Sequence, residues 1–211
     1  MTFGQVFRSK AMGLVMFQYF AGNFTFFICI SWMYPYLAEH YSLSHAEAAG
    51  YSMIPLLSGS TANWVSGFLV DLLYRSRYRA LSRRLPAMFG FLLAAAGILL
   101  VTRARHPESA VTAFALATFG VEMTISPSWA YCLDIGGKNS GALSGAMNMV
   151  GNFGGFVSAN AFPYLHRLTG STDTYFRTAA ILNAVAILCW LWLRPNFGQP
   201  SLEQPRKGVA E

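Results

Sequence analysis

The sequence predicts an all-α membrane protein built from six transmembrane helices. Of its 211 residues, 54% are hydrophobic and only 11% are charged, whereas a soluble domain carries about 25% charged residues. The few charged residues separate long apolar runs, and each run can supply the roughly 20 helical residues that cross the hydrocarbon core of a bilayer. Runs of this length exclude a β-barrel, whose strands are about half as long.

Six apolar runs follow one another along the chain. They lie between Lys10 and Glu39, Glu47 and Asp71, Arg84 and Arg103, Glu108 and Asp134, Ser140 and Tyr164, and about Tyr175 and Leu193. We expect the third and sixth runs to form a lipid-facing scaffold and the other four to carry the functional residues. Residues 1–197 are expected to form the bundle, and residues 198–211 a disordered cytoplasmic tail.

The basic residues predict how the helices are oriented. Five arginines gather between the second and third runs, within residues 75–84. Short cytoplasmic loops collect Lys and Arg, so we expect this loop and both termini in the cytoplasm and the chain in the plasma (inner) membrane. Eleven basic residues then lie inside and four outside. This distribution also accounts for the formal charge of +6 without a nucleic-acid partner.

Where the second run ends, Gly67, Asp71 and Arg75 recur every four residues and therefore share one helix face. A glycine there lets a neighbouring helix approach closely. The carboxylate can pair with the arginines that follow. We expect a conformation-dependent ion pair at this helix end, and the alternative is a solvated charge run.

The fourth run places Glu122, Ser126 and Trp129 on one helix face, because they are spaced by four and three residues. Pro127 should kink the helix between them. A carboxylate in mid-membrane costs about 2.5–3.5 kcal/mol on insertion scales, so it is retained where it faces a cavity, titrates or pairs. Glu122 is therefore a proton-coupling candidate, and the alternative is a structural carboxylate bonded to a neighbouring helix.

The fifth run is rich in small residues at the spacing that lets membrane helices pack closely. The predicted packing residues are Gly141, Gly145, Gly151, Asn152 and Gly155. Asn148, near the middle of the run, offers both a donor and an acceptor to a polar solute. The alternative for Asn148 is a hydrogen bond to a neighbouring helix.

The first run contributes Asn23, which shares a face with Tyr19, and Trp32 near its far end. Trp32 is either a cavity-lining aromatic or an anchor at the membrane interface. The sequence contains no nucleophile–base pair, no phosphate-binding loop and no Cys/His cluster with metal-ligand spacing. We therefore expect no enzyme, no metal and no cofactor.

Three stretches carry a family resemblance: residues 67–75 (GFLVDLLYR), residues 32–37 (WMYPYL), and residues 129–155. On these residues the chain resembles the C-terminal half of a major facilitator superfamily transporter, closest to the anion:cation symporter branch, over about residues 5–197. The match is incomplete. Pro35 sits one place later than usual, and Leu72 and Tyr74 replace the Arg and Gly of the general loop motif.

The resemblance implies half of a twelve-helix fold whose substrate site lies between two six-helix halves. It implies that five residues contact a small organic anion such as a hexuronate, aldarate or galactonate: Asn23, Trp32, Ser126, Trp129 and Asn148. Co-transport of a proton, or of Na⁺, is expected. Glu122, Ser126, Trp129 and Asn148 should form one wall of a mid-membrane pocket, with Glu122 protonated when the anion binds.

Membrane lipid and the N-terminal half, or a second copy of this chain, are the expected partners. A truncated reading of a longer gene is favoured over a true half-transporter. Two other functions remain open from the sequence. One is a non-transporting six-helix protein that senses a solute or regulates a partner, and the other is a neutral sugar or drug transporter of the same fold.

Overall fold

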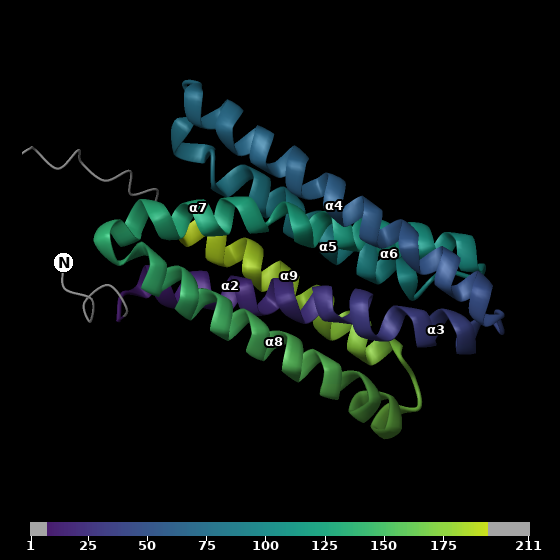
Figure 1. Ribbon diagram of the computed structural model, residues 1–211. Helices are drawn as coiled ribbons and strands as arrows, with labels where there is room; N and C mark the ends of the chain where they lie inside the picture. The colour runs from purple at the N-terminus through teal and green to yellow at the C-terminus, as the bar shows by residue number, and fades with distance from the viewer. Residues whose placement is uncertain (1–7, 194–211) are drawn as a thin grey trace, which may run out of the picture.

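A computed structural model describes residues 8–193, which contain helices and no strand. Figure 1 shows the helices packed side by side along one common direction. They are α2 (Lys10–Phe27), η1 (Ile28–Trp32), α3 (Met33–His40), α4 (His45–Arg75), η2 (Arg79–Leu81), α5 (Arg84–Val101), α6 (Pro107–Met123), α7 (Ile125–Gly136), η3 (Gly137–Asn139), α8 (Ser140–Thr169) and α9 (Asp173–Trp192). The all-α prediction is confirmed for this part of the chain.

The sequence fixes several helix ends by capping. The Ser44 hydroxyl accepts from the amide of Glu47 at 3.3 Å, and the Glu47 carboxylate accepts from the amide of Ser44 at 3.0 Å, which satisfies two amides at the start of α4. At the end of α8, Gly170 adopts φ 67° and its amide donates to the His166 carbonyl at 2.8 Å. That left-handed conformation favours glycine, so α8 ends here.

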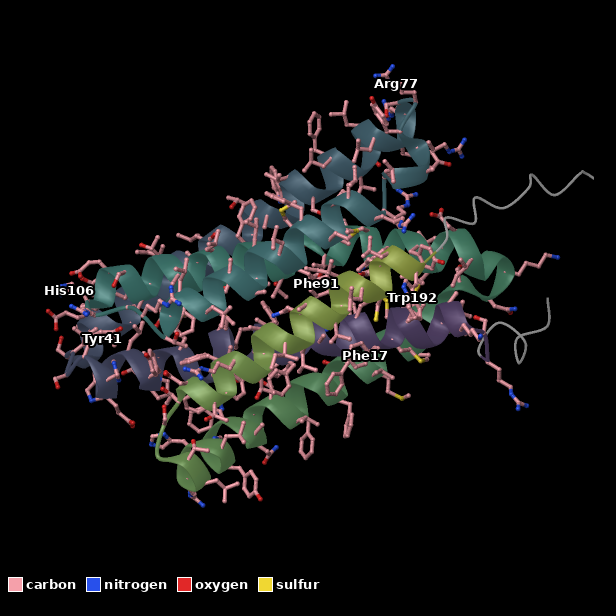
Figure 2. All side chains as sticks on the ribbon, turned by 180° about the vertical axis from the view of Figure 1, so that it is seen from behind. Phe17, Tyr41, Arg77, Phe91, His106 and Trp192 are labelled. Carbon is pink, nitrogen blue, oxygen red and sulfur yellow. The ribbon has the colours of Figure 1, made fainter. Side chains whose placement is uncertain are left out.

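The helices form two groups joined by α5 and α9. α2 packs against α8 and α9, and α6 packs against α4 and α5, while α5 also contacts α9. In Figure 1, α2, α4, α7 and α8 lie toward the viewer, and in Figure 2, which shows the opposite side, α9 lies toward the viewer. Residues Arg77 and Trp192 lie toward one end of the bundle, and Tyr41 and His106 lie at the other (Figure 2).

Glycines bring several helices into backbone contact. A Cβ at Gly97 would lie 2.4 Å from the Ala117 nitrogen, and one at Gly120 would lie 2.4 Å from the Ala94 nitrogen. No side chain fits at such distances, so α5 and α6 pack backbone to backbone. The α2–α8 contact is as close, since a Cβ at Gly154 would lie 2.5 Å from the Phe20 carbonyl oxygen.

The scaffold role expected for the sixth run needs correction, because α9 takes part in buried polar contacts. Asn183, fully buried in the middle of α9, donates to the Thr25 hydroxyl of α2 at 2.8 Å. The Trp190 indole donates to the Gln18 side-chain oxygen at 3.2 Å. A buried polar group needs a partner, and these bonds tie α9 to α2 rather than leaving it as a plain lipid-facing helix.

Within residues 8–193, four helical segments are long and apolar enough to cross a membrane: Lys10–His40, Arg79–Val101, Pro107–Thr169 and Asp173–Trp192. The fourth and fifth predicted runs fall within one of them, and α4 is not among them. α4 is less apolar because serine, asparagine and glycine residues are distributed along it. The membrane-protein class is supported, while the count of six spans stays a prediction. Residues 1–7 and 194–211, including the predicted tail, lie outside the described residues.

Candidate functional site

Tyr19 lies where α2, α7 and α8 meet. Its hydroxyl accepts a hydrogen bond from the Trp129 indole at 3.0 Å. Its ring faces Gly151, where an added Cβ would lie 2.5 Å from Tyr19 Cδ1 and 2.7 Å from Asn23 Nδ2. Two predicted binding residues, Asn23 and Trp129, are thus held beside the same tyrosine. Trp129 still exposes 38% of its surface, so its ring is open to a ligand.

Asn148 extends this surface along α8. Asn148 lies three residues before Gly151 on α8 and therefore shares the helix face that contacts Tyr19 and Asn23. Nearby, the α7–α8 contact brings the Cys132 sulfur to 3.5 Å from the Met147 sulfur. Asn148 is exposed, and its side chain has no hydrogen-bond partner among residues 8–193. We call Tyr19, Asn23, Trp129 and Asn148 the open wall.

Glu122 lies in a different place, inside the contact between α4 and α6. Its side chain is 7% exposed, and the Asn63 amide of α4 donates to its Oε2 atom. A Cβ at Gly59 would lie 3.0 Å from Glu122 Cγ, so a glycine is what makes room for the carboxylate. We call Glu122 and Asn63 the buried pair.

Pro127 accounts for the break between α6 and α7. Proline has no N–H, so it leaves the carbonyl of Met123, four residues earlier, without its helical donor. The Ser66 hydroxyl of α4 donates to that carbonyl at 2.6 Å, which restores the missing hydrogen bond. The helix is interrupted at Thr124, and the predicted kink is found three residues before the proline.

This break divides the four residues that the sequence placed on one wall. Ser126 faces α4, because its hydroxyl lies 3.9 Å from where a Cβ at Gly67 would stand. Glu122 also faces α4, whereas Trp129 reaches Tyr19 of α2. The structure therefore brings Trp129 together with Tyr19 and Asn23, and directs the side chains of Glu122 and Ser126 at α4.

Trp32 lies well away from the open wall. Its indole donates to the Ala159 carbonyl at 3.1 Å, and its ring stacks on Phe162 at 5.1 Å between centroids. Ala159 is eight residues beyond Gly151 on α8, which corresponds to roughly 12 Å along the helix. Trp32 ends the π-helical segment η1, a feature that is often found at functional sites.

The loop motif shows a different ion pair from the predicted one. Asp71 and Arg75 are both exposed, and neither forms an ion pair in the described part of the chain. Arg83 instead pairs with Asp134 at the end of α7, at 3.0 Å between Nε and Oδ2. Arg84 donates to the Trp190 carbonyl at 3.0 Å. The loop is thus tied to α7 and α9 by two arginines that the motif does not include.

The predicted packing residues of α8 separate into two sets. Gly151 and Gly155 lie in the α2–α8 contact, where a Cβ at Gly155 would overlap the ring of Phe27. Added Cβ atoms at Gly141 and Gly145 would meet nothing within 4 Å. Asn152 is exposed and donates to the Asn148 carbonyl of its own helix at 2.9 Å, so it makes no bond between helices here.

Sequence reasoning missed three residues that define these sites. Tyr19 was recognised only as sharing a face with Asn23, and its contact with Trp129 joins residues 110 positions apart. Asn63 and Asp134 had no local signal, because their partners come from other helices. Within residues 8–193 no group of three His, Cys, Asp or Glu side chains is placed to hold a metal ion.

Comparison with known proteins identifies the family. The Major Facilitator Superfamily profile matches residues 1–159. The "Probable sulfoacetate transporter" of Cupriavidus necator is 29% identical over 187 residues, 88% of this chain and 44% of that protein. The "Hexuronate transporter" of Bacillus subtilis is 26% identical over 213 residues, 96% of this chain and 49% of that protein.

A third relative is the "Probable galactarate/D-glucarate transporter" of Escherichia coli, 28% identical over 193 residues, 90% of this chain and 42% of that protein. The chain therefore spans about half the length of the curated relatives it matches. All three are named as transporters, in agreement with the expectation that the chain is not an enzyme. Since the profile covers 159 of 211 residues, the chain is an integral membrane protein that belongs to the Major Facilitator Superfamily.

Proposed function

We propose that this chain is the C-terminal half of a twelve-helix secondary active transporter that carries a small organic anion, such as a sugar acid. The names of relatives support the substrate class, since they include transporters of sulfoacetate, hexuronates and galactarate or glucarate. In this proposal six spans cross the plasma membrane, with α6 and α7 forming one span and α8 the next. The arginine-rich loop and both termini lie in the cytoplasm, as the positive-inside rule predicts.

The open wall is the observation that carries the proposal. In a chain of apolar helices, the Asn148 amide is exposed and the Trp129 indole is 38% exposed, and the two residues lie on helices that contact each other. Trp129 offers an apolar face to the carbon skeleton of a sugar acid. Asn148 and Asn23 offer donors and acceptors to its hydroxyl and carboxylate groups. The opposite wall comes from an N-terminal half or from a second copy of this chain.

Trp32 and Ser126 do not belong to this wall. We keep Ser126 as a residue of the α4–α7 contact, next to Gly67, and Trp32 as part of a separate pocket. The binding residues proposed for the substrate are therefore Asn23, Trp129 and Asn148, with Tyr19 holding Trp129 in place.

The buried pair is the proposed proton site. An ionised Glu122 accepts the Asn63 N–H, and a protonated Glu122 can donate its O–H to the Asn63 carbonyl oxygen, so the contact survives either state while the charge changes. A negative charge within the membrane would repel an incoming anion, and protonation removes it. Na⁺ is the alternative coupling ion.

Uptake of D-glucuronate into vesicles tests the proposal, with the chain expressed together with any coding sequence that precedes it in frame. We expect saturable uptake that rises as the outside pH falls from 8 to 5, and a loss of affinity in Asn148→Ala. Absence of saturable uptake for glucuronate, galactarate and sulfoacetate would overturn the substrate class. Cysteine labelling at Ser44 and Ser171 from outside, together with protection of Ser201, checks the topology.

A further inference from the structure

The described part of the chain contains a cavity at the end opposite the arginine-rich loop, about 220 Å³ in volume. It lies between α3, the end of α8 and the start of α9. Trp32, Tyr36 and Phe162 form its aromatic floor, and Glu39, His40 and His166 lie around its rim. We call these six residues the end pocket. They include Trp32, which the open wall does not use.

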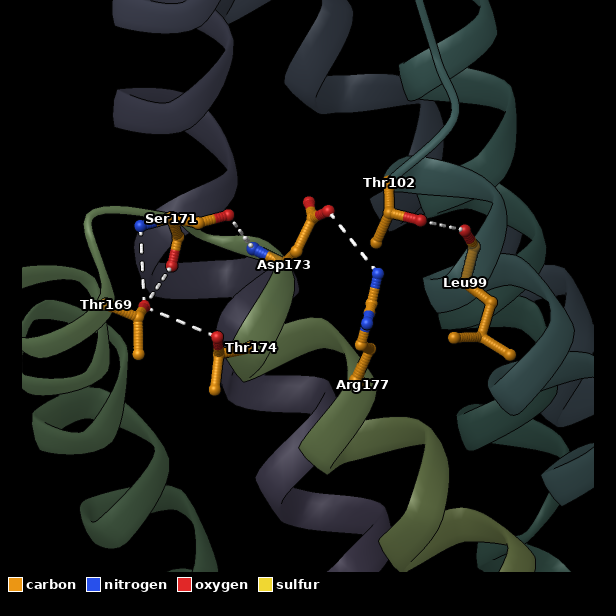
Figure 3. A network of polar contacts seen from close by, with 7 residues as sticks. All are labelled: Leu99, Thr102, Thr169, Ser171, Asp173, Thr174 and Arg177. Atoms are coloured by element: carbon orange, nitrogen blue, oxygen red, sulfur yellow. Dashed lines mark hydrogen bonds and ion pairs between the residues drawn. The ribbon is translucent and has the colours of Figure 1, made fainter.

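The walls of the end pocket are held by contacts between elements. Trp32 stacks on Phe162 at 5.1 Å and Tyr36 stacks on His40 at 5.0 Å. The turn from α8 to α9 is fixed by its own side chains, as Figure 3 shows: the Thr169 hydroxyl donates to the Ser171 carbonyl at 3.0 Å, and the Asp173 amide donates to the Ser171 hydroxyl at 3.1 Å. These contacts hold the residues around the pocket in a defined arrangement.

Charge at the rim depends on pH. Histidine becomes a cation in mildly acidic solution, whereas a glutamate stays ionised there. The rim combines one carboxylate, that of Glu39, with the imidazoles of His40 and His166. Asp173 and Arg177 face each other at 4.0 Å at the start of α9 (Figure 3), and the negative charge of Asp173 also acts on Tyr36 of the pocket floor.

The remaining ionisable groups at this end lie beside the pocket rather than in it. Arg167 follows His166 on α8, and His45 at the start of α4 is bonded to the Tyr34 hydroxyl at 2.7 Å. The Trp32 indole is occupied by the Ala159 carbonyl. The donors left for a ligand are the two histidines and the hydroxyl of Thr172, which also lines the cavity.

We propose that the end pocket is a second binding site, which takes a small organic anion from the outside of the membrane when its two histidines are protonated. The substrate class rests on the proposed function. A carboxylate or sulfonate would lie between His40 and His166, with the carbon skeleton on Trp32 and Phe162. At neutral pH the Glu39 carboxylate repels the same anion. Such a site would hold substrate where external protons are abundant, before it reaches the open wall.

Protection of a cysteine placed in the pocket tests this directly. In Thr172→Cys, we would measure the labelling rate with a neutral maleimide with and without sulfoacetate, at pH 5.5 and pH 7.5, in the chain expressed as above. The ratio of rates at each pH cancels the change in thiol reactivity. The three native cysteines are buried. Sulfoacetate remains an anion throughout this range, so any pH effect belongs to the protein.

We expect half-protection at a sulfoacetate concentration roughly fivefold lower at pH 5.5 than at pH 7.5, the upper range for one exposed charge pair. Adding His40→Gln and His166→Gln to Thr172→Cys should remove the difference in half-protection between the two pH values. Adding Glu39→Gln should improve protection at pH 7.5. Absence of protection at pH 5.5 would overturn the proposal, and so would better protection by tetramethylammonium, which would indicate a cation site.

Asn148→Ala separates this inference from the proposed function. If protection at position 172 persists in Asn148→Ala, the anion binds in the end pocket itself, and if it disappears, sulfoacetate acts from the open wall and the second site is refuted. Because labelling measures binding, pH-dependent protection without any uptake would refute transport and retain the pocket.

Discussion

The buried pair and the open wall lie on the two sides of a single predicted span, and they treat polar groups in opposite ways. Glu122 is enclosed between α4 and α6 and has a protein partner in Asn63. Asn148 is exposed, and its side chain has no partner among the described residues. A polar group that is satisfied within the protein can support a helix contact or a change of charge, whereas an unsatisfied group at the surface is available to a solute.

The break at Thr124 produces this difference. Before it, α6 directs Glu122 at α4, and beyond it, α7 directs Trp129 at Tyr19 of α2. A continuous helix would have kept the two side chains on one face. We infer that the two sites have separate roles, in which the buried pair responds to protons and the open wall binds the anion.

The largest loss of stability should come from overpacking the α2–α8 contact, which positions the open wall. Gly154→Ala places a Cβ 2.5 Å from the Phe20 carbonyl oxygen, and overpacking of this kind costs about 1–3 kcal/mol or more. Gly141→Ala is the matched control, because a Cβ there meets nothing within 4 Å. Thermal stability by size-exclusion chromatography should fall for Gly154→Ala alone. Equal stability of the two variants would contradict the packing.

Next in size is the effect of removing a ligand contact from the wall. Asn148→Ala should weaken anion binding by about tenfold, the value of one hydrogen bond to a charged group, without lowering stability. Trp64→Ala serves as the control, since Trp64 on α4 is 84% exposed and lies outside the wall. Binding of D-glucuronate measured by calorimetry checks this. A normal affinity in Asn148→Ala would move the site elsewhere.

Smaller effects are expected at the arginine-rich loop. Asp134→Asn removes one charge of the largely buried pair but keeps an oxygen that can accept from Arg83, so it should destabilise the chain by about 1 kcal/mol. Asp71→Asn should leave stability unchanged, because Asp71 is exposed, and should lower turnover more than affinity if its ion pair forms in another conformation. Thermal denaturation and uptake rates distinguish the two. A destabilised Asp71→Asn with normal turnover would be inconsistent with this assignment.

The sequence predicted the helices well and the contacts between them only in part. Apolar runs and charged boundaries report directly on where helices lie, and the glycine spacing of Gly151 and Gly155 located a close contact. The grouping of Glu122 with Trp129 stays a prediction, because helix periodicity assumes an unbroken helix and the structure interrupts this one at Thr124. The Ser66 bond that bridges the interruption comes from another element. Asn183 shows the same limit, since its partner Thr25 is 158 residues away.

The separate roles of the buried pair and the open wall are tested most directly by measuring anion affinity as a function of pH. D-glucuronate binding would be measured from pH 5 to 8 in the wild type, Glu122→Gln and Asn148→Ala. We expect Glu122→Gln, which is permanently neutral but keeps a bond to Asn63, to retain the affinity seen at low pH and to lose the pH dependence. Asn148→Ala should bind more weakly at every pH, with the pH dependence intact. Unaltered pH dependence in Glu122→Gln would show that Glu122 is not the proton site.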